Sequence, residues 1–187
     1  MRLFLAVNFD AATRRAVYEA AAPLRAAAPG LAWVDEARLH LTLKFLDEQP
    51  AEAVPGLAAA ADAVAARHDA VPSALQEFGA FPNFRRARVV WIGVAADPRL
   101  ELLHHDVEVA CEALGHAVEA RPFRPHVTLA RVKRPDPMEL RALAREARRA
   151  AAVRFPVAVR SVDLMRSTLA AEGPAYERLH SSYLRER

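Results

Sequence analysis

Hydrophobic and polar positions follow two periods along this chain, and each period predicts a different element. Short alternating apolar segments bounded by Asp, Pro or Gly indicate strands, whereas segments with an apolar stripe at helical spacing, such as the one from Leu100 to Leu114, indicate helices. The pattern predicts strands over 2–9, 39–46, 72–80, 87–95, 125–131 and 174–184, one long strand or a hairpin over 154–167, and helices over 11–27, 51–68, 98–115 and 137–152. Strands and helices that interleave in this way predict an α+β fold.

The chain contains an internal repeat with an offset of 86 positions. The segment Leu39–Leu43 resembles Pro125–Leu129, and the apolar strand that begins at Arg2 coincides, at the same offset, with the one that begins at Arg88. The helical segments coincide as well, 11–27 with 97–113 and 51–68 with 137–154. Two copies are too few for a solenoid, which needs at least three repeats.

This repeat predicts the organisation of the domain. The copies cover roughly 1–86 and 87–172, and a final strand follows over 174–184. We therefore expect a single domain over 1–187 with a bilobal, duplicated α+β fold. In this fold two lobes related by a pseudo-twofold axis carry antiparallel or mixed sheets around a central cleft.

Composition excludes several classes of protein. Of 187 residues, 53% are hydrophobic and 26% are charged, so the chain can bury a core and is neither disordered nor collagen-like. No apolar segment approaches the roughly 20 residues needed to cross a bilayer, and the N-terminal segment has the pattern of a strand rather than of a signal peptide. The single cysteine, Cys111, excludes an intrachain disulfide and a cysteine-based metal cage. We expect a cytoplasmic monomer with no membrane partner.

The basic residues are almost all arginines, since only Lys44 and Lys133 are lysines. The net charge of +3 is compatible with an anionic partner without identifying one. Arginine binds phosphate through its planar fork, but a GC-rich coding sequence would raise arginine and alanine together. Both explanations remain open.

The strongest chemical signal is a His-x-Thr pair that occurs once in each copy. In a strand, residues two apart point to the same face, so His40 lies beside Thr42, and His126 lies beside Thr128. A pseudo-twofold arrangement would bring both pairs to one cleft. Two imidazoles there can serve as general acid and general base at neutral pH, while two hydroxyls bind the oxygens of a phosphate.

These motifs and their flanks carry a resemblance to a known family. The segments LHLTLKFL over 39–46 and RPFRPHVTLAR over 121–131 resemble those of the two-histidine (2H) phosphoesterase superfamily, and in particular the RNA 2',3'-cyclic phosphodiesterases, the LigT-like 2'-5' RNA ligase family. Further typical segments are 2–7, 88–94, 167–169 and 174–179. The resemblance covers essentially the whole chain, and neither motif departs from the family pattern.

The resemblance implies hydrolysis of RNA 2',3'-cyclic phosphate ends to 2'-phosphomonoesters, without a metal or other cofactor. RNA ends of this kind, or related nucleotides, would be the partners. By position in the motifs, His40 is similar to the proton donor and His126 to the proton acceptor. Thr42 and Thr128 are similar to hydroxyls that orient the phosphate, and Arg131 is included as a further substrate-binding residue.

Several residues keep two interpretations. Strict alternation directs Arg131 away from His126, so it serves either the substrate or the rim of the cleft. Alternation puts Lys44 on the face of His40, where it meets either a phosphate or solvent. Three aromatic residues either stack on a base or pack in the core; these are Phe45, Trp91 and Tyr176.

The segment His104-His105-Asp106 resembles a metal cluster only in sequence, because adjacent helical residues diverge by about 100°. We expect it to be a solvated helix face.

Two rival functions remain. The same histidine pair could act on another phosphodiester, such as a 2'-5' oligoadenylate or a nucleotide metabolite with a cyclic phosphate, or could catalyse ligation by reversal of hydrolysis. A non-catalytic module that binds RNA ends needs hydroxyls and cations but no acid–base pair, so the two intact histidines disfavour it.

Overall fold

A computed structural model of the chain describes residues 1–170 and 173–186. The strands are β1 Arg2–Asn8, β2 Ala32–Trp33, β3 His40–Glu48, β4 Val71–Phe81, β5 Val89–Val94, β6 His126–Arg131, β7 Arg154–Val159, β8 Ser161–Ala170 and β9 Gly173–Tyr183. The helices are α1 Ala11–Ala20, α2 Ala22–Ala27, α3 Val54–Ala65, α4 Pro98–Glu112 and α5 Pro137–Arg149, and short 3-10 helices cover Glu36–Arg38, Ala51–Ala53 and Phe84–Arg86.

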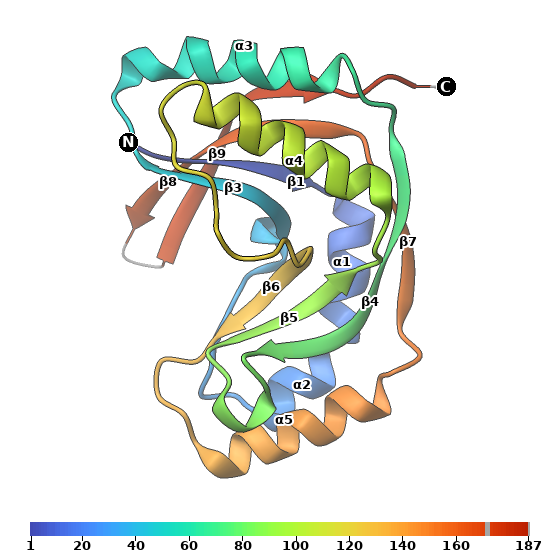
Figure 1. Cartoon of the computed structure of the whole chain (residues 1–187). Helices are drawn as coiled ribbons and strands as arrows, with labels where there is room; N and C mark the ends of the chain where they lie inside the picture. Colours follow the sequence, from blue (N-terminus) through green and yellow to red (C-terminus); the bar gives the residue numbers. More distant parts are fainter. Residues whose placement is uncertain (171–172, 187) are drawn as a thin grey trace.

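The described strands form one sheet in the order β7-β4-β5-β6-β3-β1-β8-β9, with the short β2 beside β6. Neighbouring strands are antiparallel throughout this order. The sheet is strongly curled (Figure 1). Its shortest pairing between neighbours in this order joins β3 and β6, where only Leu41 and Val127 are in register. These two residues are 86 positions apart, the offset of the sequence repeat.

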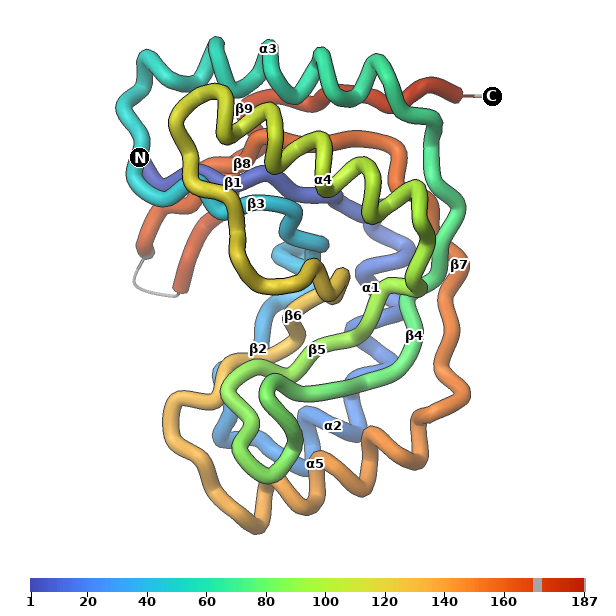
Figure 2. Tube along the Cα trace, in the orientation of Figure 1, coloured from blue at the N-terminus to red at the C-terminus, as the bar shows by residue number. Residues whose placement is uncertain are grey.

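Helices flank the sheet in two groups (Figures 1 and 2). Helices α3 and α4 pack together over the part that contains β1, β3, β8 and β9, whereas α2 and α5 pack together against the part that contains β4 and β5. Three helices begin at an aspartate whose carboxylate accepts a backbone N–H of the first turn, namely Asp10, Asp97 and Asp136. A continuous apolar core lies between the helices and the sheet. No helix in the described part of the chain is long and apolar enough to cross a membrane.

The α+β class and most predicted strands are confirmed, with ends within two residues of those expected, but two predicted helices are divided. The expected helix over 11–27 is α1 and α2, separated at Ala21, because Pro23 in the first turn of α2 has no N–H to continue the ladder of α1. The expected helix over 51–68 starts as a 3-10 turn and becomes α-helical at Val54. The two-residue strand β2 is too short to produce a periodic signal.

The expectation of one strand or a hairpin over 154–167 is wrong. This segment contains two strands that do not pair with each other: β7 pairs with β4 at one edge of the sheet, whereas β8 lies between β1 and β9 near the other edge. The hairpin at this end of the chain is formed instead by β8 and β9. Strand pairing over such distances is a property of the curled sheet, so the local sequence could not indicate it.

Candidate active site

His40 and His126 begin β3 and β6, and each is held in the same way. The Nδ1 atom of His40 lies 2.7 Å from the carbonyl oxygen of Arg38, and that of His126 lies 2.6 Å from the carbonyl oxygen of Arg124. A carbonyl only accepts, so in each ring Nδ1 carries the hydrogen. The Nε2 atom of the neutral ring is then left as a proton acceptor.

Both motifs project from one side of the sheet, which we call the histidine face and define by His40, Thr42, His126 and Thr128. The antiparallel pair of Leu41 with Val127 places His40 opposite Thr128 and Thr42 opposite His126. Each imidazole therefore lies beside the hydroxyl of the other motif. The predicted grouping of two histidines and two threonines on one face is what this register produces.

Aromatic rings surround both imidazoles. His40 contacts Phe4 and Tyr176, with centroid distances of 5.1 and 5.2 Å. His126 contacts Phe81 at 4.9 Å and Trp91 at 6.3 Å. Sequence reasoning did not select Phe4 or Phe81. The sequence does contain a signal for Phe4. Strand β1 is apolar at successive positions, which indicates that side chains on both of its faces pack against other groups.

Of the three aromatic residues with two interpretations, none belongs to the main core. Phe45 is 62% exposed and pairs with Phe4 across β3 and β1, on the histidine face. Trp91 and Tyr176 are half-buried beside the two catalytic candidates His126 and His40. All three thus lie on the histidine face.

Strict alternation misplaces Arg131. In the β5–β6 ladder, Val90 pairs with Ala130 and Trp91 pairs with Thr128, so Leu129 is an extra residue in β6. Such a bulge reverses the direction of every later side chain. Arg131 is therefore turned to the histidine face, and its charge reaches both imidazoles.

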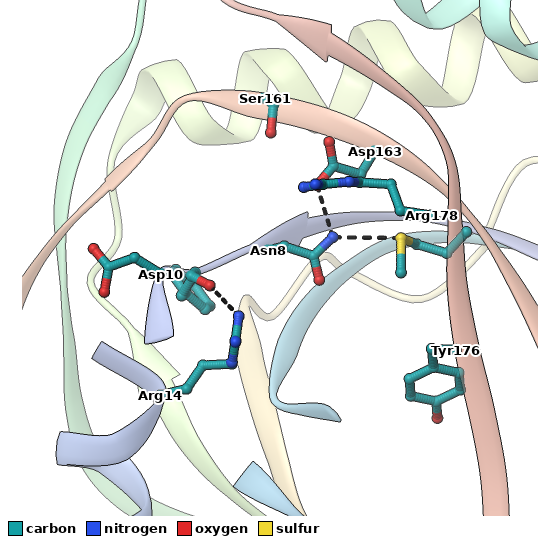
Figure 3. A pocket seen from close by; sticks show the side chains of 9 residues that line it. Asn8, Asp10, Arg14, Ser161, Asp163, Tyr176 and Arg178 are labelled. Carbon is teal, nitrogen blue, oxygen red and sulfur yellow. Dashed lines mark hydrogen bonds and ion pairs between the residues drawn. The ribbon is translucent and has the colours of Figure 1, made fainter. Parts of the chain in front are cut away.

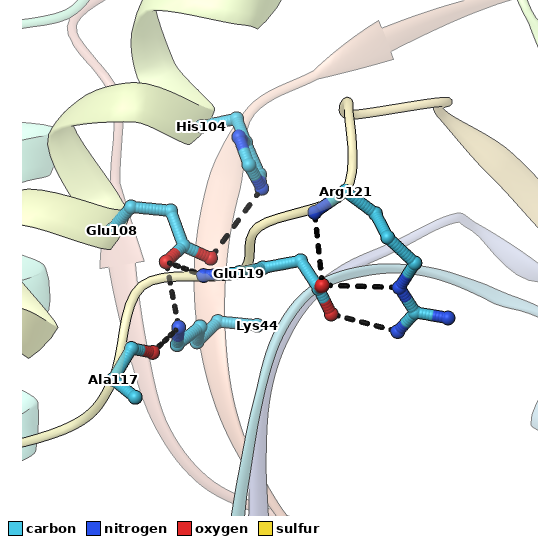
Figure 4. A network of polar contacts seen from close by, with 6 residues as sticks. All are labelled: Lys44, His104, Glu108, Ala117, Glu119 and Arg121. Carbon is cyan, nitrogen blue, oxygen red and sulfur yellow. Dashed lines mark hydrogen bonds and ion pairs between the residues drawn. The ribbon is translucent and has the colours of Figure 1, made fainter.

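The matching bulge in β3 removes Lys44 from this face. Leu5 pairs with Lys44 and Ala6 pairs with Thr42, so Leu43 is the extra residue. Lys44 is consequently buried, and its Nζ atom lies 2.6 Å from Oε2 of Glu108 on α4 (Figure 4). Both expectations for Lys44, contact with a phosphate and exposure to solvent, are wrong.

The electrostatics of the two histidines follow from their surroundings. Burial lowers the pKa of both His40 and His126 below the usual histidine value. The hydrogen bond from each Nδ1 to a carbonyl opposes this shift, and the positive charge of Arg131 adds to it. A bound phosphate would counteract the effect of Arg131 on the imidazoles.

A pocket of about 390 Å³ is lined by residues of β1, β8 and β9, among them Asn8, Asp163 and Tyr176 (Figure 3). Tyr176 lines it and contacts His40, while Asn8 lines it and pairs with His40 across β1 and β3. Asn8 donates from Nδ2 to the buried carboxylate of Asp163 at 2.7 Å, and Arg178 lies 3.8 Å from the same oxygen. The pocket extends the histidine face beyond β1 with polar side chains of both charges.

The segment His104-His105-Asp106 does not converge, but it is not simply solvated either. His104 is half-buried and stacks on Phe123, with a centroid distance of 3.8 Å and an interplanar angle of 9°. Asp106 pairs instead with His68 at 2.9 Å. Within residues 1–170 and 173–186, no group of three or more His, Cys, Asp or Glu side chains is placed to hold a metal ion.

Comparison with known proteins connects this geometry to a family. The model of the 2'-5' RNA ligase superfamily matches residues 12–170. An RNA 2',3'-cyclic phosphodiesterase from Thermus thermophilus is 36% identical over 197 aligned positions, covering 99% of this chain and 91% of the relative. An RNA 2',3'-cyclic phosphodiesterase from Geobacillus stearothermophilus is 34% identical over 128 aligned positions, which cover 68% of this chain and only 41% of the relative.

The fold is shared as well. The crystal structure of E. coli LigT complexed with 3'-AMP superposes with a TM-score of 0.76 at 27% identity, over 98% of this chain and 97% of that one. Sequence and fold thus agree over nearly the whole length of the chain. The chain belongs to the 2'-5' RNA ligase superfamily, the family of LigT-like RNA 2',3'-cyclic phosphodiesterases among the 2H phosphoesterases.

Proposed function

We propose that this chain hydrolyses the 2',3'-cyclic phosphate ends of RNA to 2'-phosphomonoesters, with two histidines and no metal ion. The observation that carries the proposal is the pair of imidazoles on one face, each with Nδ1 bound to a carbonyl and each beside a threonine of the other motif. The relatives named above are RNA 2',3'-cyclic phosphodiesterases, which supports the same substrate. The LigT complex with 3'-AMP supports nucleotide binding by this fold.

The proposed reaction proceeds by transfer of two protons. Nε2 of His126 takes a proton from a water molecule while the water oxygen forms a bond to phosphorus. The bond from phosphorus to the 3' oxygen breaks, and that oxygen receives a proton from Nε2 of protonated His40. The products are a 2'-phosphate and a free 3'-hydroxyl, and each proton transfer contributes about 10²–10⁴-fold to the rate.

The phosphate oxygens carry more negative charge in the transition state than in the substrate. The hydroxyls of Thr42 and Thr128 donate to them, and Arg131, which the bulge in β6 turns to the same face, supplies a positive charge. The lowered pKa of both histidines keeps the base neutral near neutral pH. The protonated acid is then the scarcer form at neutral pH.

We also propose that the chain is one duplicated domain that acts as a monomer. The pairing of Leu41 with Val127 at the repeat offset, and the equivalent carbonyl contacts of the two histidines, support two halves related by an approximate twofold axis between β3 and β6. The two copies are interleaved in the fold, because helix α4 of the second copy packs against α3 and β3 of the first copy. Such interleaving makes separate folding of either copy unfavourable.

The test is incubation of the purified chain with a short RNA that ends in a 2',3'-cyclic phosphate, followed by identification of the product. A 2'-phosphate is expected, and His40→Gln and His126→Gln should each lower turnover by about 10²-fold or more. His105→Gln, on the exposed side of α4, is the matched control and should turn over normally. A 3'-phosphate product, or binding without turnover, would contradict the proposal.

A substrate with sulfur in place of the 3' oxygen distinguishes the two histidines. A thiolate leaves without a proton because its conjugate acid has a pKa near 8.5. His40→Gln should therefore recover most of its lost rate on this substrate, while His126→Gln should not, since water still needs its base. Recovery by the His126 variant instead would reverse the two roles.

A further inference from the structure

The buried ion pair of Lys44 and Glu108 lies directly behind the histidine face. Both side chains are 6% exposed, and Nζ and Oε2 are 2.6 Å apart. Lys44 comes from β3, two residues after Thr42, and Glu108 comes from the middle of α4. A buried ion pair is often no more stabilising than an apolar pair of the same volume, so stability alone does not account for it.

Each member of the pair makes a second hydrogen bond, and both go to the same segment of chain. Lys44 donates from Nζ to the carbonyl oxygen of Ala117 at 2.5 Å, and Glu108 accepts the backbone N–H of Glu119 at 3.1 Å. Figure 4 shows Ala117 and Glu119 on the strip of chain that passes beside the pair. The segment 116–125 contains no helix or strand, and these contacts hold it at two points, in addition to the backbone hydrogen bonds that His116 donates to Cys111 and Val94 donates to Pro125.

His104 holds the same segment nearer to its end. Its ring stacks on Phe123, and its Nε2 atom lies 3.7 Å from Oε1 of Glu108, an atom with no hydrogen-bond partner among the described residues. Helix α4 thus contacts the segment at the ring stack as well as at the ion pair.

The attached segment ends at the carbonyl that orients His126. Arg124 follows Phe123 directly, and its oxygen lies 2.6 Å from Nδ1 of His126. The equivalent carbonyl for His40 belongs to Arg38, at the end of a 3-10 helix, and does not depend on this network. The position of the hydrogen on the His126 ring therefore depends on where the segment lies, whereas that on His40 does not.

We propose that Lys44, Glu108 and His104 are positioning residues for His126. They hold the segment 116–125 so that the Arg124 carbonyl keeps the hydrogen on Nδ1 and leaves Nε2 as the base. The catalytic consequence rests on the proposed function, in which His126 takes the proton of water. The structural consequence, the tautomer of His126, can be measured without any substrate.

The test replaces both charges at once with Lys44→Met and Glu108→Leu, which leaves no unpaired buried charge. NMR nitrogen shifts of isotope-labelled histidine side chains then report the tautomer of each ring, with His40 as the internal reference. The His126 ring should change from the Nδ1–H form to a mixture, while His40 stays unchanged. On a 2',3'-cyclic phosphate dinucleotide, kcat should fall about 10- to 100-fold, with KM within about threefold.

Two further variants complete the design. Arg67→Met removes a different ion pair on α4, that with Asp106, and should change neither the tautomer of His126 nor kcat. If the double variant does not fold, His104→Gln is measured in the same way; it removes the ring stack on Phe123 and the imidazole beside Glu108 but keeps the ion pair of Lys44 with Glu108. An unchanged His126 tautomer in the folded variant overturns the proposal, as does an equal change in His40. Absence of turnover by the unaltered chain would contradict the proposed function instead, and would leave the tautomer measurement as the deciding result.

Discussion

Arg131→Met removes the guanidinium from the histidine face and keeps the apolar stem. The bulge at Leu129 directs this side chain to the same side as His126 and Thr128. A hydrogen bond to a charged group contributes about 1.5–3 kcal/mol, and about 1.4 kcal/mol corresponds to a factor of ten. If Arg131 donates to the phosphate in the transition state, kcat/KM should fall roughly 10- to 150-fold.

The same substitution should have little effect on folding. Arg131 is exposed, and its guanidinium makes no hydrogen bond or ion pair with any residue that the structure describes. Surface changes of this kind alter stability by about 0.5 kcal/mol or less, which is about 1–2 °C in Tm for a chain of this size. Because Arg131 lowers the pKa of both histidines, its loss should raise both values and move the optimum of kcat/KM to higher pH.

The assay is steady-state hydrolysis of a cyclic-phosphate RNA across pH, together with thermal unfolding of each variant. Arg149→Met, on the exposed side of α5, is the matched control and should leave rate and optimum unchanged. Arg131→Lys should lose part of the rate, because it keeps the charge but not the fork. A kcat/KM within twofold of the unaltered chain, with the pH optimum unmoved, would refute the placement of Arg131 at the reacting phosphate.

Three further predictions follow from the same site. The profile of kcat/KM against pH should be bell-shaped with its maximum below pH 6.5. The reason is that the pKa values of both histidines lie below the ordinary 6.5, so the acid loses its proton at lower pH than an exposed histidine would. A maximum above about pH 7 would contradict this. Activity should survive EDTA and dialysis, since the proposed steps use only imidazoles; loss that a divalent ion restores would count against the mechanism. Gly79→Ala should cost about 1–3 kcal/mol and lower kcat, because the added Cβ overlaps the ring of Trp91 beside His126. Gly56→Ala, with open space around it, is the control and should not destabilise the fold.

The sequence by itself determined the parts of this protein that depend on local pattern. Alternation located the strands that carry His40 and His126, because a half-buried strand must separate apolar from polar side chains. The offset of 86 links the two motifs, and their flanks carry the resemblance to the family. Both histidines therefore followed from residue type, spacing and repetition alone.

Only the tertiary structure decided which side chains beyond the motifs lie on the histidine face. The direction of a strand residue after a bulge depends on the partner strand, and the extra residues Leu43 and Leu129 are visible only against β1 and β5. One bulge buried Lys44, and the other brought Arg131 to the histidines. The partners of β7 and β8 likewise lie far away along the chain, because pairing in a curled sheet is a long-range property. Local periodicity contains no information about such partners, so the predictions for Lys44, Arg131 and the segment 154–167 were the ones that failed.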